Sequence, residues 1–151
     1  MKEFIKQVTI LVALMIIGMS ASADDSIIGR WVQDESENGV SIRSYYDFES
    51  DGIMVQTIEI QSPRPKIDIV VSGKAVYSYK SGNIAYKCEP KDITVSRFYI
   101  EGADQNAIDY AIEEQRAEMS SQVYRFREVK VKGDKMTAVY NGNKITLKRV
   151  R

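Results

Sequence analysis

The scarcity of leucine among many β-branched residues restricts the fold of this chain more than any other feature. From Asp24 to the C-terminus the sequence holds 14 isoleucines and 12 valines but a single leucine, Leu147. β-branched side chains pack well on a pleated sheet and lose rotamer freedom in a helix. The composition therefore favours a mostly β domain over a helical bundle.

The order of residues agrees with this composition. Residues 40–49 alternate between apolar and polar positions, and residues 53–60 return as a partner strand after a Ser-Asp-Gly turn at 50–52. The Ser-Pro-Arg-Pro segment at 62–65 is predicted to be a loop, because proline cannot donate to a strand ladder. Further strands are predicted at 66–80 (bent or divided at Gly73), 84–89, 92–100, 123–131, 135–140 and 144–150. Short strands at hairpin spacing indicate a sandwich or an up-and-down barrel.

One segment departs from the β pattern. In residues 103–122 the apolar side chains of Ile108, Ile112 and Met119 recur at helical spacing. We expect a helix over about 105–120, with Asp104 as its N-cap. Glu113 and Arg116 are spaced to pair along its surface. The helix is either a lid over a barrel mouth or packs outside the barrel.

The N-terminus has the three-part pattern of a secretory signal peptide. Lys2 and Lys6 precede an apolar run at 8–19, and small residues at Ala21 and Ala23 follow. We expect residues 1–23 to be a signal peptide cleaved before Asp24, and residues 24–151 to form one domain that is periplasmic or secreted. The apolar run is shorter than a membrane-spanning helix, and no cysteine follows the cleavage point. Stable membrane insertion and a lipid anchor are therefore not expected.

Charge and the missing residue types exclude several classes of function. From Asp24 on, the chain carries 19 basic and 20 acidic residues, a balance that gives no bulk attraction to nucleic acid or anionic membranes. The chain has no histidine, which excludes Ser-His-Asp and Cys-His catalysis. Cys88 is its one cysteine, so a Cys/His zinc site cannot form, and we expect this thiol to be buried. With no nucleophile motif or phosphate loop, no enzyme activity, metal or cofactor is expected. An enzyme that uses two carboxylates, or Tyr and Lys, is the alternative that the composition leaves open.

The only tryptophan, Trp31, lies near the start of the predicted domain. In an up-and-down barrel the first and last strands are neighbours. On the last strand, Ile145, Leu147 and Arg149 share one face, so Arg149 points inward if the other two do. The indole can receive this guanidinium by a cation–π contact. We therefore expect Trp31 and Arg149 to meet and close one end of a barrel.

These residues resemble a known family. Gly29-Arg30-Trp31 resembles the Gly-X-Trp signature on the first strand of lipocalins, and Arg149 resembles the arginine that packs over that tryptophan. Residues 45–54 and the ending Ile-Thr-Leu-Lys-Arg-Val are similar to the small secreted bacterial lipocalin-like (calycin-type) β-barrel proteins. The resemblance implies an antiparallel up-and-down lipocalin-like barrel. With the strands and the helix predicted above, we expect about eight to ten strands with one inserted helix, which lies earlier in the chain than the helix of lipocalins. It also implies that a small apolar or amphipathic molecule binds in the barrel.

The expected wall of this cavity is rich in tyrosine, with rings to cover a ligand and hydroxyls to orient it. It comprises Tyr46, Ile58, Ala75, Tyr77, Tyr79 and Tyr86. The same side chains fill the core if the barrel is solid. In that case the protein is a protein-interaction module, such as an inhibitor or an envelope-assembly factor, whose loops and helix contact a protein partner.

Overall fold

The structure, a computed structural model, describes residues 27–151. The predicted signal peptide lies outside these residues. The described elements are, in chain order, β1 (Gly29–Asp34), β2 (Ser41–Phe48), β3 (Ile53–Pro63), β4 (Lys66–Lys80), β5 (Asn83–Tyr86), the short 3₁₀ helix η1 (Pro90–Asp92), β6 (Ile93–Ile100), α2 (Gln105–Ser120), β7 (Tyr124–Lys132), β8 (Lys135–Tyr140) and β9 (Asn143–Arg149).

Eight antiparallel strands close into a barrel, and β6 is one extra strand beside it. Around the barrel, β1 pairs with both β2 and β9, and the chain continues through β3, β4, β5, β7 and β8. Because the barrel is closed, its eight strands have no free edge within it. The predicted mostly β barrel with one inserted helix is confirmed in the described part of the chain.

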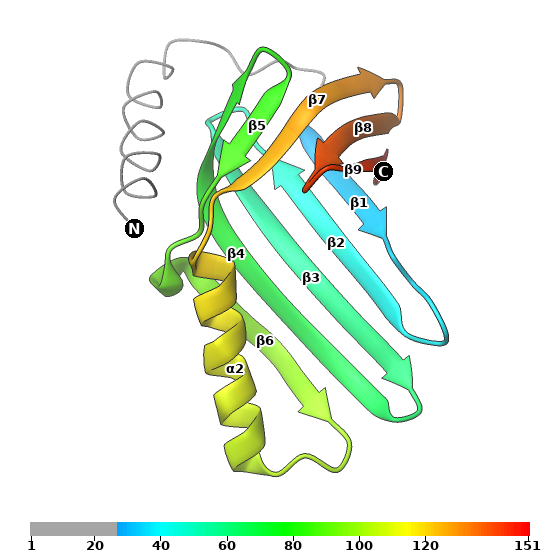
Figure 1. Cartoon of the computed structure of the whole chain (residues 1–151), viewed down its shortest axis with the longest axis vertical. Coiled ribbons are helices and arrows are strands. Elements are labelled where there is room, and N and C mark those ends of the chain that lie inside the picture. The colour runs from blue at the N-terminus through cyan, green and yellow to red at the C-terminus, as the bar shows by residue number, and fades with distance from the viewer. Residues whose placement is uncertain (1–26) are drawn as a thin grey trace.

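β4 is longer than the barrel and changes partner along its length. Its last residues pair with β5, whereas Ile67–Gly73 pair with β6. On its other side, β4 pairs with β3 over the whole length from Lys66 to Val76. The first half of β4 therefore continues beyond the barrel beside parts of β2 and β3. Together with β6 these segments form an open sheet, which we call the extension (Figure 1).

One prediction about this region needs correction. The segment 62–65 is not wholly a loop, because β3 continues through Ser62 to Pro63 and only Arg64 and Pro65 form the turn. Pro63 is the last residue of β3, where a missing N–H costs no central ladder bond. Of the two alternatives for 66–80, the single strand is observed, and Gly73 marks the place where its neighbour changes from β6 to β5.

The helix prediction is confirmed in bounds and in its cap. Asp104 accepts a hydrogen bond from the backbone N–H of Ala107 at 2.8 Å, which satisfies one of the donors at the helix start. The Arg116 guanidinium lies 2.8 Å from the Glu113 carboxylate. The helix stands beside the extension rather than inside the barrel (Figure 1). It packs mainly against β6 and η1.

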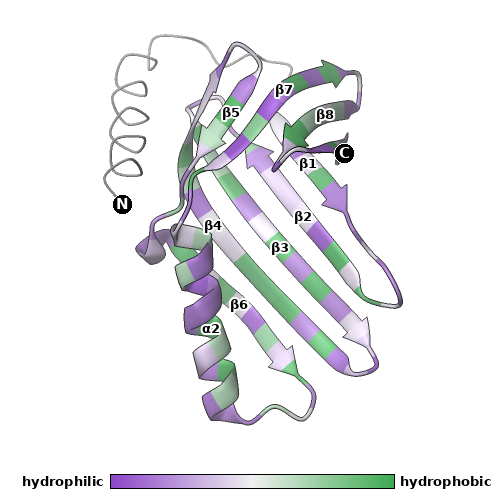
Figure 2. Cartoon of the chain, viewed as in Figure 1, coloured by the Kyte–Doolittle hydropathy of each residue, from purple (hydrophilic) through white to green (hydrophobic). Residues whose placement is uncertain are grey.

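Period-two alternation separates the two faces of the sheet. Figure 2 shows apolar bands alternating with polar bands along β2, β3 and β4. The face that lines the barrel continues without a break onto the extension, because β2, β3 and β4 keep one register throughout. An apolar face therefore extends beyond the closed cylinder.

Candidate functional site

One end of the barrel is closed by Trp31 and Arg149. The two residues are partners in the β1–β9 ladder, and the guanidinium carbon lies 4.2 Å from the centre of the indole. Trp31 is fully buried, and its Nε1 donates to the carbonyl of Ile27 at 2.9 Å. Arg149 donates to the carbonyl of Ile28 at 2.8 Å. The inward arginine is thus partnered by a ring face and a backbone oxygen.

Gly29 makes room for this arrangement. A Cβ at this position would lie 2.8 Å from a guanidinium nitrogen of Arg149. The residue also has φ of +122°, a conformation that favours glycine. The Gly-X-Trp spacing therefore has a local steric cause.

The barrel interior behind this closed end is filled by large side chains. Fully buried residues include Phe48, Met54, Phe126, Met136 and Leu147. The residues predicted to line a cavity all belong to one core cluster, in which Tyr46, Ala75, Tyr77 and Tyr86 are buried and Ile58 and Tyr79 are partly buried. The structure therefore brings the six predicted wall residues together, with Phe48 and Phe126 packed among them.

The hydroxyls of two wall tyrosines bond within the protein. Tyr77 donates to the carbonyl of Glu49 at 2.7 Å, and Tyr86 donates to Oε1 of buried Gln56 at 2.9 Å. Burial raises the pKa of Tyr77 to about 12, and burial likewise raises the pKa of Tyr86 well above its ordinary value. Both phenols are therefore neutral donors, Tyr77 to a backbone carbonyl at the β2–β3 turn and Tyr86 to a buried side chain.

Five rings form an aromatic cluster at the barrel end that adjoins the extension. Edge-to-face or stacked contacts join Tyr46, Tyr86, Tyr124, Phe126 and Tyr140, with ring centres between 5.1 and 6.4 Å apart. Tyr124 and Tyr140 are only partly buried. Sequence reasoning did not select these two rings, which are the first residue of β7 and the last residue of β8.

The apolar face of the extension begins beside this cluster. The ladder places Ile42, Ile60, Ile69 and Phe98 in one row across β2, β3, β4 and β6. Ile58, Val71 and Val95 form the row nearer the barrel, and Ile67 with Ile100 forms the outer row. We call these nine side chains the isoleucine face.

Helix α2 covers only one side of the isoleucine face. Met119 is buried, and its terminal methyl would lie 3.2 Å from a Cβ placed on Gly73 of β4. On the β2 and β3 side of the face, Ile42, Ile58 and Ile60 remain partly exposed. Partly exposed apolar side chains in adjacent rows are a feature of binding surfaces.

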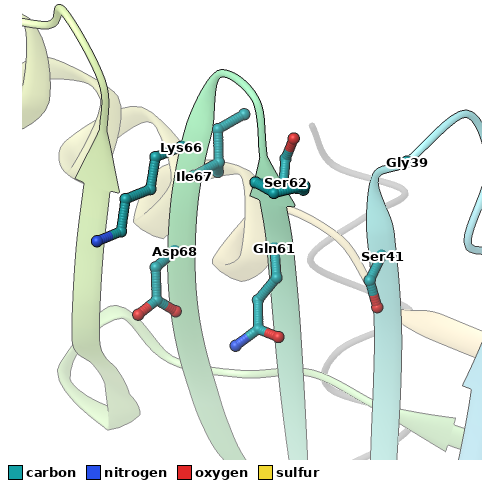
Figure 3. Close-up of a pocket in the computed structure, with 8 residues that line it drawn as sticks. Gly39, Ser41, Gln61, Ser62, Lys66, Ile67 and Asp68 are labelled. Atoms are coloured by element: carbon teal, nitrogen blue, oxygen red, sulfur yellow. The ribbon is translucent and has the colours of Figure 1, made fainter.

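The opposite face of the extension is polar, and a shallow hollow lies at the β3–β4 turn, lined by residues of this face together with Ser62 and Ile67 of the other. Ser41, Gln61 and Asp68 lie in register on three neighbouring strands and project from this side, with Lys66 beside Asp68 (Figure 3). The hollow has a volume of about 620 Å³. A second hollow of about 390 Å³ adjoins it at the β1–β2 loop. Neither hollow is lined by a residue of the predicted barrel wall.

Within residues 27–151, no three histidine, cysteine, aspartate or glutamate side chains gather as a metal-binding group. Within the same range, no helix has the length and apolar character needed to span a membrane. Burial raises the pKa of the Cys88 thiol to about 11, with smaller contributions from nearby acidic residues.

Comparison with other proteins adds no relative. No protein-family model matches this chain, and no curated protein matches it.

Proposed function

We propose that this protein is an exported, non-catalytic binding protein that holds a small apolar or amphipathic molecule against the isoleucine face. The observation that carries the proposal is the continuity of this face with the aromatic cluster. A ligand there contacts Ile58 and Tyr46 of the predicted wall, together with Ile42, Ile60 and Tyr140. The predicted wall residues deeper in the barrel then support the site from behind.

The energetics favour a ligand with an alkyl chain. Removing apolar surface from water contributes about 0.8 kcal/mol for each methylene group that is buried. The isoleucine face offers partly exposed apolar side chains in successive rows across four strands. An extended chain laid along these rows buries its own surface and that of the protein together.

A place in the lipocalin-like class supports this function. The closed barrel, and the Arg149 guanidinium over the Trp31 ring, agree with the resemblance seen in the sequence. Lipocalin-like barrels generally hold an apolar molecule at an open mouth. In this chain the barrel is filled with side chains, so we place the molecule outside it, where the mouth continues as the extension.

The test compares an isoleucine-to-asparagine change on β3 with a valine-to-asparagine change on β4. Ile60→Asn lies in the central row of the face, whereas Val76→Asn replaces an apolar residue that is 44% exposed and points away from the barrel interior. Binding of dodecyl maltoside, below its micelle concentration, is followed by calorimetry. We expect Ile60→Asn to weaken binding about tenfold and Val76→Asn to leave it unchanged. Equal binding by both variants would contradict the proposed site.

The filled barrel favours a second candidate, a protein-interaction module. Under this alternative the face and the helix contact a protein partner, and no small molecule is carried. Native mass spectrometry of the protein purified from its own host separates the two. A retained small molecule supports the carrier, whereas a stoichiometric protein partner on a ligand-free chain supports the alternative.

A further inference from the structure

Acidic residues outnumber basic residues in the elements around the isoleucine face. None of its nine side chains is charged, and the same rows add Ser44, opposite Ile58, and Ser62, opposite Ile67. Helix α2 carries four acidic residues and one basic residue, Arg116, whose guanidinium is paired with Glu113. The two basic residues of β1 and β2 are also paired, Arg30 with Asp47 and Arg43 with Asp34.

Glu35 lies at one end of the central row. Gly29, Trp31 and Gln33 alternate onto the inner face of β1, and Glu35 continues this alternation one residue after the strand ends. Its backbone N–H donates to the carbonyl of Ile42 at 2.9 Å. Its carboxylate accepts a hydrogen bond from the Gln33 amide at 2.7 Å. This carboxylate is therefore held beside the first isoleucine of the row.

Glu118 approaches from the other side. It precedes Met119, the helix residue buried against the sheet, and is itself exposed. Burial is the main cause of the raised pKa of Tyr140, and the negative charges of Glu118 and Glu35 raise it further. Glu118 also acts on Tyr124 in the same direction. Glu35 lies at the β1 end of the face and Glu118 lies on the helix next to buried Met119. Both charges act on Tyr140, a partly exposed ring of the aromatic cluster that packs against Tyr124 and Phe126.

We propose that the molecule held on the isoleucine face is a cationic amphiphile, whose alkyl chain lies along the isoleucine rows and whose positive head group lies by Tyr140 between Glu35 and Glu118. This inference rests on the proposed function and specifies its ligand. Aromatic rings bind ammonium groups by cation–π attraction, which strengthens as water is removed. The nearby carboxylates supply the opposite charge, and an anionic head group would be repelled there.

The test uses three probes with the same dodecyl tail and different head groups. Dodecyltrimethylammonium is cationic, dodecyl maltoside is neutral and dodecanoate is anionic. Each is titrated below its micelle concentration at low salt, with circular dichroism to show that the protein stays folded. We expect the cation to bind about tenfold more tightly than the neutral probe, and the anion to bind most weakly.

Matched variants locate the head group. Glu35→Gln and Glu118→Gln each remove one charge at the border of the face, and each is expected to weaken binding of the cation about threefold. Binding of dodecyl maltoside should stay unchanged in both. Glu113→Gln is the control, because it makes the same change on the same helix at a carboxylate paired with Arg116.

The outcomes separate this inference from the function on which it rests. Equal affinity for the three probes, or tightest binding of dodecanoate, overturns the cationic ligand and leaves an apolar binding site. A cation preference that Glu35→Gln and Glu118→Gln do not reduce overturns the placement of the head group. Failure of all three probes to bind overturns the proposed function as well.

Discussion

The pair of Trp31 and Arg149 shows how two residues far apart in sequence fix one end of the fold. A guanidinium that is partly removed from water, as in Arg149, is costly unless its charge and its donors are satisfied. Here the indole face, the Ile28 carbonyl and the Asp134 carboxylate at 3.7 Å surround it. These partners come from both ends of the chain, so the contact joins the first strand to the last.

Trp31→Ala removes the largest buried side chain of this closed end. We expect the free energy of unfolding to fall by about 3–5 kcal/mol, because the indole leaves a cavity that the strands cannot fill. Urea denaturation followed by far-UV circular dichroism measures the loss. Tyr110→Ala is the control, since Tyr110 is 71% exposed and its removal should cost little. A loss below about 1 kcal/mol for Trp31→Ala would show that the indole does not support the barrel.

Tyr86→Phe tests the buried hydrogen bond between the aromatic cluster and Gln56. The change keeps the ring but leaves Oε1 of buried Gln56 without its donor. We expect a loss of about 1–3 kcal/mol in the free energy of unfolding. Replacing both residues, as Tyr86→Phe with Gln56→Met, should recover part of the loss, because no unpaired polar group remains. If the double variant is less stable than Tyr86→Phe alone, the lost hydrogen bond does not explain the loss of stability in Tyr86→Phe.

The sequence reveals some of these residues better than others. The Gly-X-Trp spacing and the alternation Ile145, Leu147, Arg149 are sufficient to place the closed end. Tyr124 and Tyr140 are harder to find, because each stands at a strand terminus. In addition, the register of β7 shifts between Arg127 and Lys130, where Glu128 has φ of +52°. Simple alternation of inward and outward side chains therefore assigns one half of this strand to the wrong face.

At the scale of elements, alternation predicts faces but not partners. Ile67, Ile69 and Val71 share a face with Ala75 and Tyr77 in any register, and the structure agrees. The length of β4 gives no sign that it pairs with β6 first and β5 later. That choice depends on long-range pairing, which a local pattern does not contain. The extension was therefore missed, although every strand in it was predicted.

Gly73→Ala tests the close packing of Cys88 and of Met119 from helix α2 against β4. An added Cβ would lie 2.7 Å from the Cys88 sulfur and 3.2 Å from the Met119 methyl. We expect a loss of about 1–3 kcal/mol in the free energy of unfolding from this overpacking. Chemical denaturation of Gly73→Ala, Cys88→Ala and the double variant gives the coupling between them. The double variant should lose less than the sum of the single variants, and strict additivity would contradict this contact.

Across the whole molecule, buried neutral acids make stability depend on alkaline pH. Burial raises the pKa of Cys88 from 9.0 to about 11 and that of Tyr77 from 10.0 to about 12. When the pH exceeds the ordinary pKa of either group, the unfolded chain releases the thiol or phenol proton, whereas the folded chain keeps it. Stability is therefore fully present below about pH 9 and falls as pH rises toward about 12.

Urea denaturation at successive pH values measures this decline. In Cys88→Ala the free energy of unfolding should begin to fall at a pH about one unit higher, near the ordinary pKa of tyrosine. The wild-type curve should show no histidine step near neutral pH, since the chain has none. A free energy of unfolding that stays constant between about pH 8 and 11 would contradict the burial of these groups.

The whole molecule divides into a filled barrel and an open extension. Buried aromatic and aliphatic side chains stabilise the barrel, and Trp31 with Arg149 closes one of its ends. The extension shares strands with the barrel and carries the partly exposed isoleucines. Under the proposed function, stability and binding belong to different parts of one continuous sheet.

Isoleucine methyl NMR spectra recorded during titration with dodecyl maltoside test this division most directly. Isoleucines occur both on the exposed face and inside the barrel, so one experiment reports on both. We predict that the methyl signals of Ile42, Ile58 and Ile60 shift with ligand concentration, whereas those of buried Ile27 and Ile84 do not. Shifts confined to Ile27 and Ile84 would place the ligand inside the barrel and contradict a binding site on the extension.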